Sequence, residues 1–207
     1  MSTKRARTVL GHYGEAGFSD GSHVSALFDT PASIELSPDC TNFDISFVMT
    51  DSGNNAVRTI AVDSNDVWTV QTMTGGRNSG YRDGDPISSA MSSPNDIAFD
   101  STGNLLISDT GNNVIRYFDK STGTTSTLAG TQTTWLNPEN DATVAPPTAG
   151  AYLDATGEGC GGAAMFDSPT GLATNTDDDT IVISDQANHA MRLIVWDPVA
   201  AAQTTAH

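Results

Sequence analysis

The chain has 207 residues and a formal net charge of −16, with only nine Lys and Arg residues. So acidic a surface repels nucleic-acid phosphates and anionic lipid, and we expect no nucleic acid partner. No apolar run reaches the ~18–20 residues that a membrane helix needs, so we expect no membrane insertion. Abundant Gly, Ser, Thr, Asn and Asp are typical of a protein with many short strands and turns.

The first predicted element is a short strand at 7–11, because "RTVLG" there matches "STLAG" at 126–130, the end of a longer repeat. The surrounding sequence, "MSTKRARTVLGHYG", is basic but lacks the apolar run of a signal peptide. These features indicate a cytosolic protein or a segment of a longer chain.

Three landmarks then recur in the same order three times. Gly-rich stretches that end at or near Asp lie at 11–21, 75–84 and, more loosely, 150–157. Groups of small apolar residues that end in Pro lie at 26–31, 89–94 and 163–169. Turn-and-strand motifs follow, "DSGNNAVRTI" (51–60), "DTGNNVIRYF" (109–118) and "DQANHAMRLI" (185–194). Repetition on this scale indicates a repeat architecture.

Within the second copy, short apolar segments predict four strands, at 95–100, 105–109, 114–119 and 124–130. Turns rich in Gly and Asn join them into an antiparallel meander. Such a sheet has two faces to cover, and stacking several sheets radially covers them. The sequence therefore predicts an all-β fold, a β-propeller of three four-stranded antiparallel blades and an N-terminal outer strand.

The turn motif suggests roles for its own residues. Gly53 and Gly111 can take the positive φ of the turn at little cost, and Asn tolerates the same region. Ala187 stands in their place in the third copy, so Asn188 or Gln186 should carry that dihedral there. An Arg follows each Asp by seven residues and is expected to be its structural partner. The residues assigned to this structural repeat are Asp51, Gly53, Asn54, Arg58, Asp109, Gly111, Asn112, Arg116, Asp185, Asn188 and Arg192.

The segments "NLLISDTGNNVIRYFD" (104–119) and "TLAG" (127–130), with the "DG…A.F..P" lead-in, resemble the NHL repeat family. The resemblance extends from about Thr8 to Ile194 and implies an NHL-type propeller, a fold that most often has six blades. Some NHL relatives, the peptidyl-amidoglycolate lyases, hold zinc and calcium, but this chain shows no matching set of His ligands. TRIM-type NHL proteins bind RNA through a basic face, which this acidic chain does not support.

We predict one propeller segment over 1–207. Its parts are a strand at 7–11, blade 1 at about 17–74, blade 2 at about 80–130, an insertion at 131–162 and blade 3 at about 163–207. The end, "AAQTTAH" (201–207), aligns with the last strand of a blade. Three blades do not close a propeller. Two copies could form a six-bladed ring, a longer chain could supply the other blades, or open arcs could stack into a filament.

Two cysteines are too few for a disulfide scaffold. Cys40 and Cys160 could pair with each other, pair between chains in a ring, or stay free. The polar insertion at 131–162 is either a loop that binds a partner or a loop without function, since loops tolerate insertions at little cost. Its candidate contact residues are Trp135, Glu139, Tyr152 and Glu158.

No catalytic motif is present, and the only candidates for a metal are Asp177 and Asp179. They offer a weak Ca²⁺ site or a solvated turn, and no other cofactor is expected. We expect a non-enzymatic module for protein–protein interaction or self-assembly, in a larger extracellular or cell-surface protein or filament. Its partner would be another copy or further blades of a longer chain, and a cytoplasmic setting stays open. The alternatives are a metal-dependent propeller lyase or hydrolase and a sensor domain that binds a ligand on its axis.

Overall fold

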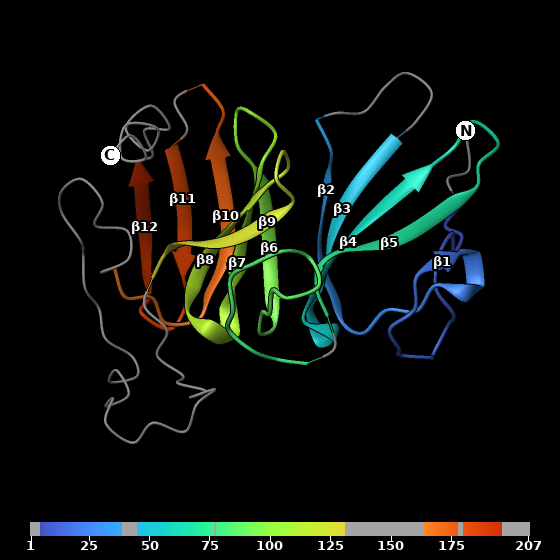
Figure 1. Cartoon of the computed structure of the whole chain (residues 1–207), viewed down its shortest axis with the longest axis horizontal. Helices are drawn as coiled ribbons and strands as arrows, with labels where there is room; N and C mark the ends of the chain where they lie inside the picture. Colours follow the sequence, from blue (N-terminus) through green and yellow to red (C-terminus); the bar gives the residue numbers. More distant parts are fainter. Residues whose placement is uncertain (1–4, 39–44, 77, 131–163, 178–179, 196–207) are drawn as a thin grey trace.

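The computed structural model describes residues 5–38, 45–76, 78–130, 164–177 and 180–195. Over these residues the protein is all-β, with three antiparallel sheets that follow one another along the chain (Figure 1). The predicted all-β class with antiparallel sheets is therefore confirmed, and we call the sheets blades 1, 2 and 3. They run from right to left in Figure 1, from blue through green to red.

Blade 1 consists of β2 (Pro31–Leu36), β3 (Ile45–Asp51), β4 (Ala56–Val62) and β5 (Trp68–Gly75), with the short β1 (Gly21–Ser22) added at the edge of β5. The 3-10 turn η1 (His23–Ser25) follows β1, and η2 (Ser52–Asn54) joins β3 to β4.

Blade 2 repeats this meander with β6 (Pro94–Phe99), β7 (Leu105–Asp109), β8 (Val114–Asp119) and β9 (Thr124–Ala129), and η3 (Thr110–Asn112) joins β7 to β8. In blade 3 the described strands are β10 (Pro169–Asn175), β11 (Thr180–Asp185) and β12 (Ala190–Val195). The register is the same in all three blades, since Arg58, Arg116 and Arg192 stand opposite Met49, Ile107 and Ile183.

The blades pack face to face through two apolar cores. Val48 and Val57 of blade 1 pack with Ile97, Leu105 and other residues of blade 2. Leu106 and Ile115 of blade 2 pack with Ile181, Ile183 and Phe166 around blade 3. Because side chains alternate between the faces of a strand, each blade offers one apolar face to each neighbour.

The predicted strand at 7–11 does not form. No neighbouring strand is described beside these residues, and a strand exists only through its ladder partners. The segment nevertheless lies where a preceding blade would end. A Cβ on Gly11 would lie 3.4 Å from the Phe28 ring, and those on Gly75 and Gly130 would lie 2.7 and 3.0 Å from Met91 and Phe166, at equivalent positions.

The positive φ of the first two turns does not lie at their glycines. The left-handed residue of each turn is Asn55 (φ 55°) or Asn113 (φ 58°), not Gly53 or Gly111. These two positions require glycine for another reason, which is lack of space. A Cβ on Gly53 would lie 2.6 Å from Asp29 Cγ, and one on Gly111 would lie 2.4 Å from Ser92 Oγ. Asn tolerates the left-handed region, so it takes the dihedral while Gly provides room.

The third turn corrects an expectation, since neither Asn188 nor Gln186 takes the left-handed conformation. His189 does so, at φ 52°. The Ala187 N–H donates to the Asp167 carbonyl at 3.0 Å, the same bond that the Gly53 and Gly111 N–H groups make at 2.9 and 2.8 Å. The turn thus keeps its backbone bond although its sequence has changed.

Candidate interaction surfaces

A buried carboxylate inside each blade forms hydrogen bonds that hold its segments together. In blade 1, Asp51 Oδ2 accepts hydrogen bonds from Arg58 Nη1 at 2.6 Å and from Asn54 Nδ2 at 2.9 Å. Its Oδ1 accepts from the Asp29 N–H at 2.7 Å. Asp51 and Arg58 are both fully buried. The carboxylate therefore joins the turn, the strand after it and the segment that leads into the blade.

Blades 2 and 3 repeat this cluster. The Arg–Asp distance is 3.0 Å for Arg116–Asp109 and 2.9 Å for Arg192–Asp185. Asn112 and Asn188 donate to the same carboxylates at 2.8 and 2.9 Å. This is the pairing that the seven-residue spacing predicts, and it places the three Arg–Asp pairs inside the blades.

A second carboxylate holds two of the arginines. Arg58 Nη2 donates to Asp20 at 2.7 Å and Arg116 Nη2 donates to Asp83 at 2.7 Å. The guanidinium groups also lie over aromatic rings, 4.7 Å from Phe18 for Arg58 and 5.1 Å from Tyr81 for Arg116. Burial raises the pKa of Asp109 to about 6, although Arg116 and the Asn112 amide lower it. The clusters thus tie each lead-in to its sheet.

Equivalent hydrogen bonds cross the two interfaces between neighbouring blades, and we call each such interface a joint. Thr50 Oγ1 donates to the Asn95 carbonyl at 2.9 Å in the first joint, and Ser108 Oγ donates to the Thr170 carbonyl at 2.8 Å in the second. The left-handed turn residues also cross the joint. Asn55 Oδ1 accepts from the Ser93 N–H at 2.9 Å, and Asn113 Oδ1 accepts from the Ser168 N–H at 2.7 Å. One joint design therefore occurs twice in the described chain.

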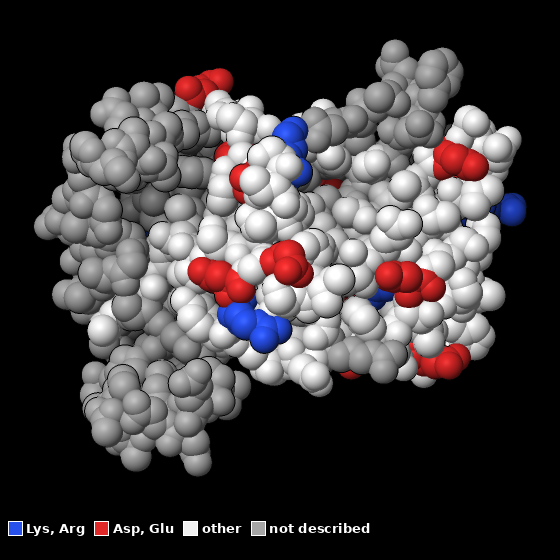
Figure 2. Space-filling model, in the orientation of Figure 1, with Lys and Arg blue, Asp and Glu red and all other residues white. Residues whose placement is uncertain are grey.

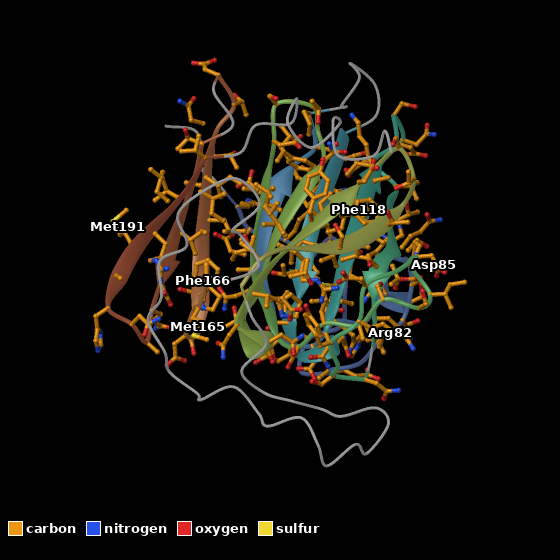
Figure 3. The ribbon with its side chains drawn as sticks, turned by 60° about the vertical axis from the view of Figure 1, so that its left-hand side comes forward. Arg82, Asp85, Phe118, Met165, Phe166 and Met191 are labelled. Atoms are coloured by element: carbon orange, nitrogen blue, oxygen red, sulfur yellow. The ribbon has the colours of Figure 1, made fainter. Side chains whose placement is uncertain are left out.

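The outer face of blade 3 carries the apolar half of the same joint. Met191, Leu193 and Val195 alternate along β12 and are 78%, 63% and 71% exposed. We call these residues the Met191 face. Met191 stands opposite Ser184, just as Val57 stands opposite Thr50 and Ile115 opposite Ser108. Val57 and Ile115 are fully buried against the next blade. Figure 3 shows Met191 pointing away from the sheets.

The outer face of blade 1 carries the other half. Ile34 and Leu36 of β2 are more than half exposed, and beside them Phe47 and Trp68 are half-buried and stacked, with ring centroids 6.1 Å apart. We call these residues the Ile34 face. Ile34 stands opposite Met49 as Ile97 stands opposite Ile107, and Ile97 is fully buried against the preceding blade.

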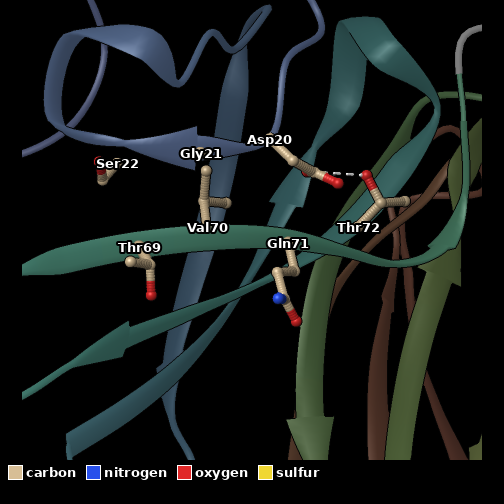
Figure 4. A pocket seen from close by; sticks show the side chains of 7 residues that line it. All are labelled: Asp20, Gly21, Ser22, Thr69, Val70, Gln71 and Thr72. Carbon is tan, nitrogen blue, oxygen red and sulfur yellow. Dashed lines mark hydrogen bonds between the residues drawn. The ribbon is translucent and has the colours of Figure 1, made fainter.

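Two open hollows lie elsewhere on the described surface. One, of about 600 Å³, lies beside β1 and β5, where Thr72 Oγ1 donates to Asp20 at 3.1 Å (Figure 4). The other, of about 570 Å³, lies where β2, β6 and β10 end, near Glu35, Phe99 and Thr174. The buried Asp100 carboxylate beside it accepts from the Thr102 and Asn104 N–H groups, so it organises its own turn.

Potential metal ligands do not gather in the described part of the chain. No three His, Cys, Asp or Glu side chains among them lie close enough to hold a metal ion. Figure 2 shows separate acidic groups, and fewer basic ones, on a largely uncharged surface. None of the described helices is long and apolar enough to span a membrane.

Several predicted site residues lie outside the described residues. They are Cys40, Cys160, Trp135, Glu139, Tyr152, Glu158 and Asp179. Asp177 lies in the turn after β10, where its N–H donates to Asn175 Oδ1 at 3.2 Å. The sequence pattern predicts that end sheets left alone expose apolar faces, but sequence reasoning named none of the residues of the Met191 and Ile34 faces. Aligning the repeats would have revealed them, because apolar residues recur at positions that pack between blades.

No protein-family model and no curated protein matches the sequence. Solved structures do match. A structural-genomics protein of unknown function from Bacteroides thetaiotaomicron is 20% identical over 72% of this chain and 32% of its own, with a TM-score of 0.55. Auxiliary nutrient binding proteins from the same organism and from Bacteroides ovatus are 16% and 15% identical over 72% of this chain and 34% of theirs, with TM-scores of 0.56 and 0.55.

At this identity the likeness concerns the fold alone. The chain spans about a third of the length of the solved structures it matches. It therefore shares its fold with about a third of each larger protein.

Proposed function

We propose that this chain is a non-enzymatic β-propeller module of the NHL type, which acts in protein–protein interaction or self-assembly through its two open blade faces. The observation that carries the proposal is the exposure of Met191, Leu193 and Val195 at positions that pack against the next blade elsewhere in the chain. An apolar patch of this kind on a protein surface marks an interaction site.

The buried equivalents define the partner's chemistry. Val57 and Ile115 pack against the apolar face of a following sheet, so the Met191 face suits such a sheet rather than a small ligand. Burying a side chain of this size contributes about 1.5–3 kcal/mol, and three such residues offer several kcal/mol toward association.

The polar residues support a binding role. The carboxylates and guanidinium groups of the repeat pair with each other inside the blades. We therefore assign them a structural role and no role in general acid–base catalysis. Two of the similar structures are named auxiliary nutrient binding proteins, which accords with a binding module. An extracellular or cell-surface setting is part of this proposal and rests on the acidic, Lys-poor composition.

The chain offers both halves of a joint, so self-association of the full chain is the test. Light scattering over a concentration series should give a mass above that of one chain. The variant Met191→Lys with Leu193→Lys should lower that mass to one chain, because two charges would have to be buried in the joint. The control variant, Thr122→Lys with Thr124→Lys, adds the same charge to an exposed hairpin of blade 2 and should associate like wild type. A wild-type chain that stays monomeric, or a lysine pair on the Met191 face that changes nothing, would overturn the proposal.

A further inference from the structure

We infer that residues Arg7–Gly11 of one copy form the fourth strand of blade 3 in a second copy, by pairing with the edge of β12 that faces away from β11. This inference rests on the proposed function and names its partner. The match between "RTVLG" and "STLAG" is the starting observation, since Ser126–Ala129 lie in β9, the outer strand of blade 2.

The acceptor edge is β12. In blades 1 and 2 the corresponding strands, β4 and β8, each pair with an outer strand, β5 and β9. Within the part of the chain that the structure describes, β12 pairs with β11 alone. The outer edge of a sheet presents a row of backbone N–H and C=O groups that can accept a strand from another chain.

The glycine at the end of each outer strand, which we call the closing glycine, identifies which segment supplies the missing strand. Gly75 (φ 75°) and Gly130 (φ 102°) follow or end the outer strands. A Cβ there would lie 2.5 Å from the Asn55 carbonyl oxygen or 2.7 Å from that of Asn113, so no other residue fits. After Gly171 the sequence contains no glycine, so residues 172–207 cannot supply one for blade 3. Gly11 has the required positive φ, at 86°.

An added Cβ on Gly11 would make only the side-chain contact that its equivalents make. This Cβ would meet the Phe28 ring, as those of Gly75 and Gly130 meet Met91 and Phe166, but among the described residues it would meet no carbonyl of a preceding turn. In the second copy that carbonyl belongs to His189, the third left-handed turn residue. The lead-in of blade 1 is thus already placed for a preceding blade.

The register follows from blade 2. There Tyr117 stands opposite Ser126, and Arg116 stands opposite Thr127. The equivalent pairs are Leu193 with Arg7, and Arg192 with Thr8.

Strand donation also brings the two open faces together. Leu10 packs against the core on the outer side of blade 1, next to Ala26 and Met49. A donor strand held there places the Met191 face of one copy on the Ile34 face of the other. Ser184 then takes the role of Thr50 and Ser108, and it donates to the Ala32 carbonyl. His189 takes the role of Asn55 and Asn113, and it accepts from the Thr30 N–H.

Disulfide trapping tests the register in the full chain with Cys40→Ser and Cys160→Ser. Directly opposite residues have Cα atoms about 4.5–5.5 Å apart, within disulfide reach. We expect a mixture of the single variants Arg7→Cys and Leu193→Cys to form a linked pair on oxidation. Thr8→Cys mixed with Leu193→Cys is the control, because neighbouring residues point to opposite faces of a strand and this pair should not link.

The outcomes separate this inference from the proposed function. If wild type assembles but Arg7→Cys and Leu193→Cys do not link, strand donation is wrong and the proposal about the faces stands. A chain that carries both Arg7→Cys and Leu193→Cys gives a further check, because a link formed within its monomer would also overturn donation between copies. If no assembly forms at all, both fail. A closed dimer and a longer polymer each support the inference, because both use the same joint.

A glycine pair gives a second test that needs no disulfide. Gly11→Ala should weaken self-association about tenfold or more, because its Cβ would meet the second copy's turn carbonyl. Gly14→Ala is the matched control, since Gly14 also has a positive φ, 78°, but an added Cβ there meets nothing within 4 Å. Equal association of the two variants would contradict the donated strand.

Discussion

In blade 2, Arg116 Nη1 donates to Asp109 Oδ2 across 3.0 Å, and both side chains are fully buried. Each charge is tolerated in the interior because the other is there. Arg116→Met should therefore lower the free energy of unfolding by about 3–5 kcal/mol, since it leaves Asp109 buried without its cation. Asp83→Asn should cost less, because Asp83 is half-exposed and water screens its charge. Chemical denaturation of both variants checks this order, and equal losses would contradict it.

The same carboxylate makes stability depend on pH. Burial raises the pKa of Asp109 from 3.8 to about 6, so between these values the folded chain binds more protons than the unfolded chain. The free energy of unfolding should then fall as pH rises from about 4 to 6, by roughly 3 kcal/mol at most from this group. Asp109→Asn cannot titrate and should lose this part of the slope. Denaturation of both proteins at several pH values measures the difference, and identical slopes would refute the assignment.

The closing glycine of blade 2 should tolerate no side chain. Gly130 and Gly123 both have a positive φ, at 102° and 71°. A Cβ on Gly130 would lie 2.7 Å from the Asn113 carbonyl oxygen, while one on Gly123 would meet nothing within 4 Å. Gly123→Ala should cost about 1–2 kcal/mol for the backbone conformation alone. Gly130→Ala should cost about 1–3 kcal/mol more from overpacking, and thermal unfolding of the pair would show whether it does.

His189 occupies the turn position at which Asn55 and Asn113 cross their joints. His189→Asn restores the acceptor that both internal joints use, and Asn adopts the left-handed conformation readily. We expect this variant to keep the stability of the chain and to tighten self-association several-fold, as one better hydrogen bond would. Sedimentation over a dilution series measures the change. A weaker assembly than wild type would mean that His189 does not meet the Thr30 N–H.

The sequence determined the all-β repeat, the order of strands in blade 2 and the partnership of Asp109 with Arg116. These features depend on alternation and spacing, which are local properties of a chain. It also indicated a preceding blade at 7–11, through the match to 126–130.

Only the tertiary structure decided which faces are covered. Val57 and Met191 hold equivalent positions and are both apolar, yet one is fully buried and the other is 78% exposed, because only Val57 has a following blade in the described chain. The turn glycines show the same limit. A side chain at either glycine would collide with Asp29 or Ser92, which lie more than fifteen residues away in the sequence. The φ values of the glycines themselves do not require glycine. Strand 7–11 failed for a related reason, since a strand needs a partner that the pattern of its own residues cannot supply.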